Sequence, residues 1–320
     1  MNRTNTSRIR TAVVGVGHQG RWHADKFAAL EQSKLVAVVD SDAARCREVA
    51  DAHGVEALET IDALIGEVDA VSVATPTRTH FDIVGTLLDN GIHVLVEKPV
   101  TATVDEATRL VELADARGLV FQVGHLERFN PAILGMADRV ELPRFIESNR
   151  IAPYKPRSLD VSVVLDLMIH DIDLIHSFVR SPMVQVDAIG RSVFSNSIDV
   201  ANARIRFENG CVANVTSSRI SLKTERSLRI FQDESYLSVD LHNKHFSAYT
   251  KRGDGPVNGP EDVIIDRQSY DSSDALLTQS RAFLDSVAGG PAPLVSGRTA
   301  MQALHTATVI GDRLASDAAG

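Results

Sequence analysis

Cysteine is scarce in this sequence, which holds only Cys46 and Cys211 among its 320 residues. Two cysteines are too few for a disulfide framework or a cysteine metal site, so a reducing cytoplasm fits best. Long apolar runs are also lacking, because none approaches the roughly 18 residues that a membrane-spanning helix needs. The opening residues MNRTNTSRIR contain no apolar signal core, which argues against secretion. We therefore expect a cytoplasmic protein with no membrane partner.

Basic residues are in the minority, with 33 Lys and Arg against 42 Asp and Glu, which gives a net charge of −9. This balance argues against a protein that coats nucleic acid or anionic membranes, so we expect no nucleic-acid partner. Any phosphate must be bound by a local group of residues. Hydrophobic residues make up 44% of the sequence and charged residues 23%, which is typical of a folded globular protein rather than a disordered one.

The length predicts about two domains at roughly 150 residues each. From Ile9 to Gly124, apolar strand-like runs alternate with helical stretches, which is typical of a doubly wound parallel sheet. Later runs alternate apolar and polar residues and predict a mostly antiparallel, open sheet, with a solvent loop at 251–260. We therefore predict an α/β protein with one domain at 1–124 and a second α/β domain at 125–320.

A glycine motif joins the first predicted strand to the first predicted helix. Gly15, Gly17 and Gly20 have the spacing G-x-G-x-x-G, with His18 and Gln19 between the last two. Such glycines allow a tight turn, the close approach of a pyrophosphate to the backbone and the packing of the helix on the strand, while the helix N-terminus faces the anion. The motif therefore predicts a dinucleotide-binding Rossmann domain.

Asp40 ends the second predicted strand, twenty residues after the last motif glycine. A carboxylate there accepts hydrogen bonds from the adenosine ribose and repels a 2′-phosphate, which favours NAD over NADP. The alternative is that Asp40 only starts a turn. Polar residues also follow later strands, at the sheet edge where such folds bind ligands. We predict cofactor contacts from the motif, from Asp40 and from these strand ends: Gly15, Gly17, His18, Gln19, Gly20, Asp40, Thr75, Pro76, His80, Glu97 and Lys98.

Lys98 belongs to the sequence Glu97-Lys98-Pro99, which follows a buried strand. Partial burial and the positive nicotinamide both lower the pKa of such an amine towards the range of an acid or base. The alternative is a lysine that pairs with carboxylates at a strand end.

A helix in the second domain carries Asp166, His170 and Asp173 within about 60° of one another, at roughly 100° per residue. Its other residues are too apolar for a solvated surface, so this polar stripe requires partners or a cavity. A buried histidine satisfied by two carboxylates is the alternative. A metal site with His170, His176 and Asp166 is disfavoured because the two imidazoles diverge, and we predict no metal.

These motifs together resemble the Gfo/Idh/MocA oxidoreductase family, in order and spacing over nearly the whole chain. The resemblance implies a Rossmann domain and a second α/β domain, with hydride transfer between a sugar or cyclitol carbon bearing a CH–OH group and NAD. It implies catalytic roles for Lys98, Asp166 and His170. Met168 departs from the glycine that many members have at that position.

Two further stretches, at 124–131 and 150–157, are more similar to members that act on nucleotide sugars such as UDP-N-acetylglucosamine, whereas the helix motif is similar to inositol dehydrogenases. Residues 144–157 carry four cations and one carboxylate, which predicts a diphosphate contact in an acidic chain. Pairing of these cations with surface carboxylates is the alternative. The predicted substrate contacts are Arg128, Asn130, Arg150, Tyr154, Lys155, Arg157 and Asp173.

Three functions follow from these observations. The first is an NAD-dependent dehydrogenase of a UDP-sugar, the second a dehydrogenase of a free sugar or myo-inositol, and the third a non-catalytic NAD-binding sensor. Because Lys98 and His170 are both present, an enzyme is favoured over a sensor. The resemblance also implies a homodimer or homotetramer that packs through the open sheet.

Overall fold

The computed structural model of the protein describes residues 8–154, 161–271 and 273–318. Over these residues the chain divides into two compact units, and each unit takes two separate stretches of sequence. The first runs to Leu126 and also includes Asp274–Met301, while the second contains Glu127–Ser273 and the chain from Gln302 onwards. The predicted division differs at the C-terminal side, because 274–301 return to the first unit. There the Phe283 ring stacks on Phe27, with 6.4 Å between the ring centroids.

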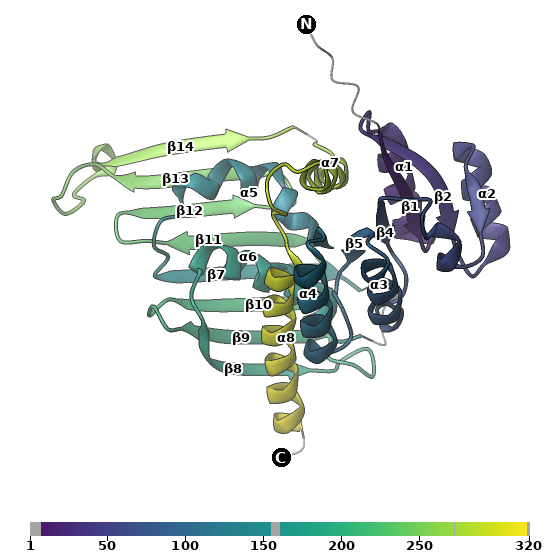
Figure 1. Cartoon of the computed structure of the whole chain (residues 1–320). Helices are drawn as coiled ribbons and strands as arrows, with labels where there is room; N and C mark the ends of the chain where they lie inside the picture. The colour runs from purple at the N-terminus through teal and green to yellow at the C-terminus, as the bar shows by residue number, and fades with distance from the viewer. Residues whose placement is uncertain (1–7, 155–160, 272, 319–320) are drawn as a thin grey trace, which may run out of the picture. The chain divides into compact units, whose positions relative to one another are not determined.

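The first unit contains a six-stranded sheet in the order β3-β2-β1-β4-β5-β6, with every neighbouring pair parallel (Figure 1). The order reverses between β1 and β4, which is the point where such sheets bind nucleotides. The predicted doubly wound sheet is confirmed, although the short strand β3 was not among the predicted runs. The strands are β1 (Ile9–Val14), β2 (Ser33–Val39), β3 (Glu56–Leu58), β4 (Ala70–Val73), β5 (His93–Glu97) and β6 (Phe121–Gly124).

Local sequence explains where the helices of this unit begin and end. Thr103 and Glu106 form a reciprocal capping box at the start of α4, and Gly118 ends that helix with a left-handed backbone. The helical segments of the unit are α1 (His18–Ala29), α2 (Ala43–His53), η1 (Ile61–Leu64), η2 (Thr77–Thr79), α3 (His80–Asp89), α4 (Val104–Arg117) and α7 (Ala275–Val287).

The second unit contains an eight-stranded sheet in the order β14-β13-β12-β11-β7-β10-β9-β8 (Figure 1). Only β7 and β10 are parallel among its described neighbours, so the predicted mostly antiparallel sheet is confirmed. The sequence analysis did not identify β13 and β14. The strands are β7 (Phe145–Pro153), β8 (Met183–Arg191), β9 (Val200–Phe207), β10 (Val212–Ser221), β11 (Glu225–Phe231), β12 (Ser235–Asp240), β13 (His245–Lys251) and β14 (Val263–Ser269).

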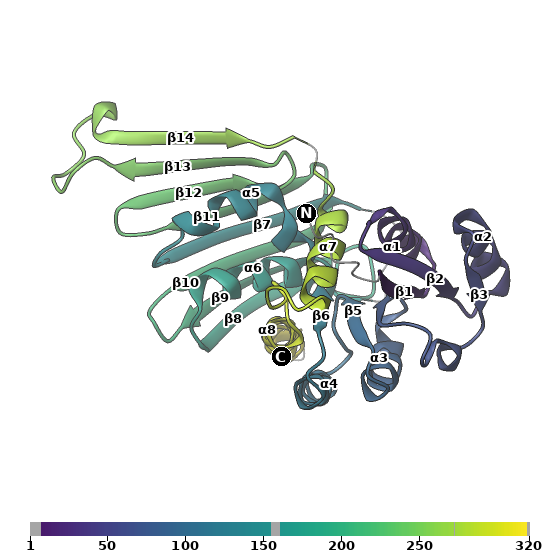
Figure 2. The same ribbon diagram turned by 45° about the horizontal axis from the view of Figure 1, so that its top comes forward.

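Helices cover one face of this sheet, as Figure 2 shows. Apolar side chains from α5, α6 and α8 form one core with alternate residues of the strands, such as Ile146, Val215 and Leu237. The helical segments are η3 (Leu126–Phe129), α5 (Pro131–Met136), η4 (Ala137–Arg139), η5 (Val164–Met168), α6 (Ile169–Val179), η6 (Pro260–Asp262) and α8 (Gly297–Ala318). Within the described ranges, no helix has both the length and the apolar character to cross a membrane.

Candidate active site

The glycine motif forms the turn between β1 and α1. Gly15 has a φ of +82°, and a Cβ added to it would lie 2.8 Å from the Ala74 carbonyl oxygen. A Cβ at Gly20 would lie 1.7 Å from the Gly15 carbonyl oxygen, whereas a Cβ at Gly17 would meet no atom within 4 Å. Side chains at positions 15 and 20 would therefore clash with the surrounding backbone, whereas the space beside Gly17 is free of protein atoms. Because Gly17 caps α1 without a side chain, the helix N-terminus offers backbone donors for a pyrophosphate.

Asp40 lies at the end of β2, where the sequence predicts the ribose contact. Its carboxylate accepts hydrogen bonds from the backbone N–H groups of Val16 and Asp42, each at 2.8 Å, and from the Arg45 guanidinium. Burial alone would raise the pKa of the Asp40 carboxyl, but the bonds from Arg45, Asp42 and Val16 hold it below its usual range. Asp40 is thus a fixed anion beside the glycine turn.

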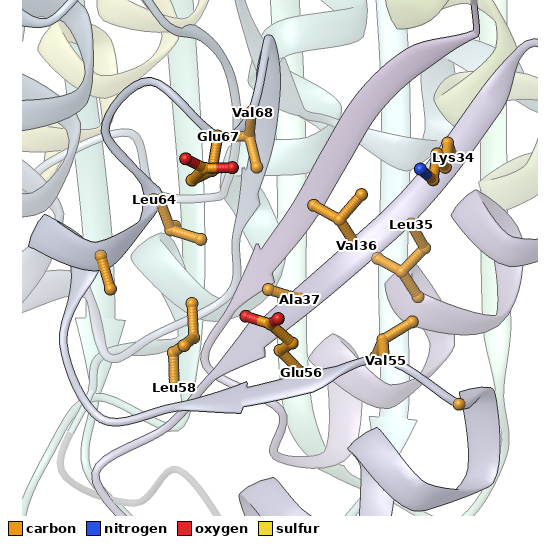
Figure 3. Close-up of a pocket in the computed structure, with 12 residues that line it drawn as sticks. Lys34, Leu35, Val36, Ala37, Val55, Glu56, Leu58, Leu64, Glu67 and Val68 are labelled. Carbon is orange, nitrogen blue, oxygen red and sulfur yellow. The ribbon is translucent and has the colours of Figure 1, made fainter.

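The ends of β4 and β5 carry the other predicted cofactor residues. Thr75 and Lys98 are partly exposed and Pro76 is exposed, while His18 and Gln19 are exposed in the first turn of α1. Their positions leave the predicted cofactor contacts open to a ligand. The hollow in Figure 3, of about 670 Å³, is a different feature, because its lining comes from β2, β3, η1 and the segments next to them, including Leu35, Val55 and Leu64.

His80 and Glu97, two of the predicted cofactor contacts, form hydrogen bonds inside the protein. Both nitrogens of the buried His80 ring face carbonyl oxygens, with Nδ1 3.0 Å from Pro99 O and Nε2 2.9 Å from Thr75 O. The Glu97 carboxylate lies 2.9 Å from His23 Nε2. These bonds hold both groups inside the protein, and their contact with the cofactor stays a prediction.

The helix with the predicted acid/base residues begins with a wide turn. Residues 164–168 form the π-helical segment η5, in which Ile169 N–H bonds to Val164 O, and α6 continues from Ile169. Asp166 lies in η5 and His170 in the first turn of α6, and both side chains are partly exposed. The regular 100° rotation used in the sequence analysis therefore does not hold before Ile169. Such wide turns occur frequently at functional sites.

Arg150, a predicted diphosphate contact, forms ion pairs inside the protein. It is buried in β7, where Nε and Nη2 bond to both oxygens of Asp171 at 2.8 and 3.0 Å and Nη1 lies 2.8 Å from Glu127 Oε1. Two carboxylates thus neutralise this cation, but they lie inside the protein and are not the surface carboxylates of the alternative. Burial alone would raise the pKa of the Glu127 carboxyl, but Arg150 holds it below its usual range. The ion pairs fix α6, the helix of His170, on the sheet.

The other predicted substrate contacts differ in how they are placed: some are buried and some are exposed. Asn130 is buried and its Oδ1 accepts the Ala132 N–H, so it caps α5 rather than facing a ligand. Arg128 Nη1 lies 3.7 Å from Asp173 Oδ2, which brings two predicted contacts together. Tyr154 is 37% exposed and meets the Phe194 ring edge-on at 5.4 Å. Lys155 and Arg157 lie outside the described residues.

The metal alternative gains no support over the described ranges, which hold no group of three His, Cys, Asp or Glu side chains placed to bind an ion. His176 Nε2 is instead 2.8 Å from Thr306 Oγ1 of α8, and burial lowers the pKa of its imidazole.

Arg45, His23 and Phe194 also contact predicted site residues, although none of the three was predicted. Arg45 was detectable in principle, because it lies one helical turn into α2, beside Asp40. His23 and Phe194 acquire their partners only through tertiary structure.

Comparison with known proteins places both units in known families. Residues 9–125 match a family described as an oxidoreductase family with an NAD-binding Rossmann fold, and residues 144–238 match the GFO/IDH/MocA C-terminal domain.

Two enzymes illustrate the range of relatives. UDP-N-acetylglucosamine 3-dehydrogenase of Acidithiobacillus ferrooxidans is 41% identical over 281 residues, which are 88% of this chain and 89% of that protein. A solved structure of that enzyme matches with a TM-score of 0.89 and 37% identity, covering 96% of this chain and 98% of the other. The scyllo-inositol 2-dehydrogenase (NAD(+)) of Bacillus subtilis is 26% identical over 311 residues, 90% of this chain and 89% of that protein.

Proposed function

The chain belongs to the Gfo/Idh/MocA family of NAD-binding oxidoreductases, and we propose that it oxidises UDP-N-acetylglucosamine at C3 with NAD. The observation that carries this proposal is the 41% identity, over most of both chains, to an enzyme with that activity. The inositol dehydrogenase reaches 26% over a similar length, so it supports the family more than the substrate.

The first unit fits the cofactor. The open side of Gly17, the uncapped N-terminus of α1 and the anionic Asp40 provide a pyrophosphate site and a ribose acceptor at the point where the strand order reverses. These residues, with Thr75 and Pro76, would hold NAD, which would supply the hydride acceptor for the hydrogen at C3 of the sugar. Lys98 follows the neighbouring strand, β5, and is our candidate for the reacting end.

His170 removes the proton of the 3-hydroxyl group as its carbon loses hydride. An imidazole suits this role because histidine normally titrates near neutral pH. The Lys98 ammonium group donates a hydrogen bond to the same oxygen and stabilises the developing negative charge. Asp166, in the wide turn before α6, orients the imidazole. The products are a 3-keto sugar, NADH and a proton.

The nucleotide end of the substrate requires a contact other than Arg150. Tyr154 and Phe194 form an exposed aromatic pair at the end of β7, and we assign the uracil ring to this pair. Arg128, next to Asp173, remains a candidate for the sugar end.

The assembly is a homodimer or homotetramer in this proposal. The sheet face opposite α5, α6 and α8 carries the stacked rings Phe231, Tyr236 and Tyr249 beside Phe145, and all four are only partly buried. A second copy would cover them. A cytoplasmic location agrees with the two cysteines, which are buried and free rather than joined in a disulfide.

The deciding experiment follows NADH absorbance when the protein and NAD are mixed with a panel of UDP-N-acetylglucosamine, UDP-glucose, free N-acetylglucosamine, glucose and myo-inositol. We expect NADH with the first compound at a kcat/KM at least about tenfold above the free sugars. UDP-N-acetylglucosamine deuterated at C3 identifies which carbon is oxidised, because oxidation at C3 must transfer the deuterium to the reduced cofactor.

The same panel separates the alternatives. Efficient turnover of myo-inositol or a free hexose, with none of UDP-sugars, would replace the proposed substrate. Tight NAD binding without NADH from any compound would favour the sensor.

A further inference from the structure

The backbone of Lys98 is held by hydrogen bonds on both sides, and each set of bonds ends on a buried histidine. His23 of α1 is fully buried and His80 of α3 is 1% exposed. Neither imidazole can reach a substrate, yet each contacts a residue next to Lys98 in sequence. Because buried polar groups are normally satisfied by specific partners, these contacts define where the lysine lies.

The residue before Lys98 is held through His23. The His23 ring lies between two partners, with Nε2 2.9 Å from Glu97 Oε1 and Nδ1 2.8 Å from Ser72 Oγ. The second carboxylate oxygen, Glu97 Oε2, accepts the backbone N–H of Lys98 at 3.3 Å. A continuous chain of hydrogen bonds therefore runs from β4 through α1 to the Lys98 backbone.

The Glu97 carboxylate has little room to move. A Cβ added to Gly124 of β6 would lie 2.9 Å from Glu97 Oε1, so the carboxylate is packed against the neighbouring strand. Burial alone would raise the pKa of the Glu97 carboxyl, but the hydrogen bond and charge of His23, with the charge of Lys98, hold it below its usual range. The anion is thus held in place by sterics and by charge.

The residue after Lys98 is held through His80. The ring bridges Pro99 O at 3.0 Å and Thr75 O at 2.9 Å, which joins the segment after β5 to the loop after β4. Carbonyl oxygens only accept hydrogen bonds, so a neutral ring donates to one of them and an imidazolium to both. In either form the ring joins Pro99, the residue after Lys98, to the loop that carries the predicted cofactor contacts Thr75 and Pro76.

We propose that His23 and His80 are positioning residues for Lys98, one fixing the residue before it and the other the residue after it. This inference rests on the proposed function, in which Lys98 contacts the reacting oxygen. A displacement of about 1 Å in such a group is enough to cost roughly 100-fold in rate. At saturating NAD, the two histidines therefore affect kcat through the lysine. His80 also holds Thr75, so only His23 is expected to leave cofactor binding unchanged.

The test replaces each histidine by leucine, which removes its hydrogen bonds, and by glutamine, whose amide supplies one donor. We expect the leucine variants to lose roughly 10- to 100-fold in kcat with UDP-N-acetylglucosamine. We also expect the KM of both leucine variants and the NAD Kd of His23→Leu to change by less than about threefold, with kcat taken at saturating NAD. The glutamine variants are expected to recover part of the rate. The matched control is His93→Gln at the opposite end of β5, where the ring only accepts the Val120 N–H. It is expected to keep the wild-type kcat.

The double variants with Lys98→Ala give the sharpest result. If the histidines act only through Lys98, adding His80→Leu or His23→Leu to Lys98→Ala causes no further loss of rate. Additive losses would overturn the inference, as would full kcat in a folded leucine variant. Should Lys98→Ala itself keep full activity, the proposed function would fail instead, so the two failures are distinguishable.

A second readout needs no substrate or cofactor. Pyridoxal phosphate followed by borohydride labels accessible lysines, and mass spectrometry of the digested protein gives the rate at Lys98. We expect Lys98 to be labelled severalfold faster in both glutamine variants, because its backbone is less constrained, and unchanged in His93→Gln. Equal rates in all four proteins would contradict the inference even if a leucine variant fails to fold.

Discussion

Arg45 holds both oxygens of the Asp40 carboxylate, with Nη2 2.8 Å from Oδ1 and Nε 3.2 Å from Oδ2. Two backbone N–H groups bind the same oxygens. A ribose can therefore bind Asp40 only if the guanidinium gives up at least one contact. A released guanidinium lies where it would attract a 2′-phosphate, so Arg45 opposes the discrimination against NADP that Asp40 provides.

Asp40→Asn removes the anion and leaves Arg45 without its strongest partner. We expect NAD to bind roughly 5- to 100-fold more weakly, as for a lost charged hydrogen bond, and NADP to bind more tightly than in the wild type. Isothermal titration of both cofactors measures the two Kd values. Asp42→Ser is the matched control, because it removes the same charge two residues away and serine still caps α2. An unchanged ratio of NAD to NADP affinity in Asp40→Asn would show that Asp40 does not select the cofactor.

Lys98→Ala and His170→Ala test the two proposed catalytic residues. We expect each to lower kcat by roughly 100-fold or more, because one removes the stabiliser of the alkoxide and the other the base. The NAD Kd should stay within about threefold of the wild type. Stopped-flow measurement of NADH formation gives kcat, with His245→Ala, an exposed residue of β13, as the control. A variant that reacts at the wild-type rate removes its residue from the mechanism.

Arg150→Met tests whether Arg150 supports the fold or binds phosphate. The substitution leaves Asp171 buried without its main partner, so we expect a loss of roughly 3 to 5 kcal/mol in the free energy of unfolding. Urea unfolding measures it. Arg144→Met is the control, since its pair with Asp233 is exposed and its loss should cost less than about 1 kcal/mol. Equal stability of the two variants, with a raised KM only for Arg150→Met, would restore the diphosphate role.

Asp199 makes stability depend on pH. Burial alone would raise the pKa of its carboxyl, but hydrogen bonds from Ser195 and from the N–H groups of Val193 and Phe194 hold it far below its usual range. A lowered folded-state pKa gives stability that is present above the unfolded pKa, about 3.9, and is lost as the pH falls below it.

Asp199→Asn should therefore lower the free energy of unfolding by about 2 kcal/mol at pH 7. The difference from the wild type should shrink between about pH 4 and pH 3. Urea unfolding over this range measures both, with the exposed Asp187→Asn as the control. If the difference in unfolding free energy between wild type and Asp199→Asn does not change with pH, the loss of stability comes from altered packing and not from the charge of Asp199.

The sequence predicts the first unit well because its signals are local. The glycine motif, the strand-ending Asp40 and the buried parallel strands each depend on residues close together in the chain. The short strand β3 lacked such a signal. It has only three residues and two of them are exposed, so it offers no hydrophobic pattern.

The second unit was predicted less completely because its decisive contacts are distant in sequence. Arg150 pairs with Asp171, which lies 21 residues further along the chain. The local excess of cations in the sequence instead predicted a free Arg150 that binds a diphosphate. The edge strand β14 has only partly buried or exposed residues, so it has no apolar face for a pattern to reveal. The wide turn at Asp166 depends on the hydrogen bond from Ile169 N–H to Val164 O, which the residue types in this segment do not predict.

The return of residues 274–301 to the first unit makes the two units alternate along the chain, because the second unit contains both 127–273 and the chain from Gln302 onwards. A fragment ending at residue 126 would lack Phe283, the partner of Phe27, and the Val295 carbonyl that accepts the Val123 N–H of β6. Exchange of the second unit between relatives therefore requires three crossover points rather than one. Recombination at a single point would transfer an incomplete Rossmann unit, so substrate specificity in such chains changes more readily by substitution than by domain exchange.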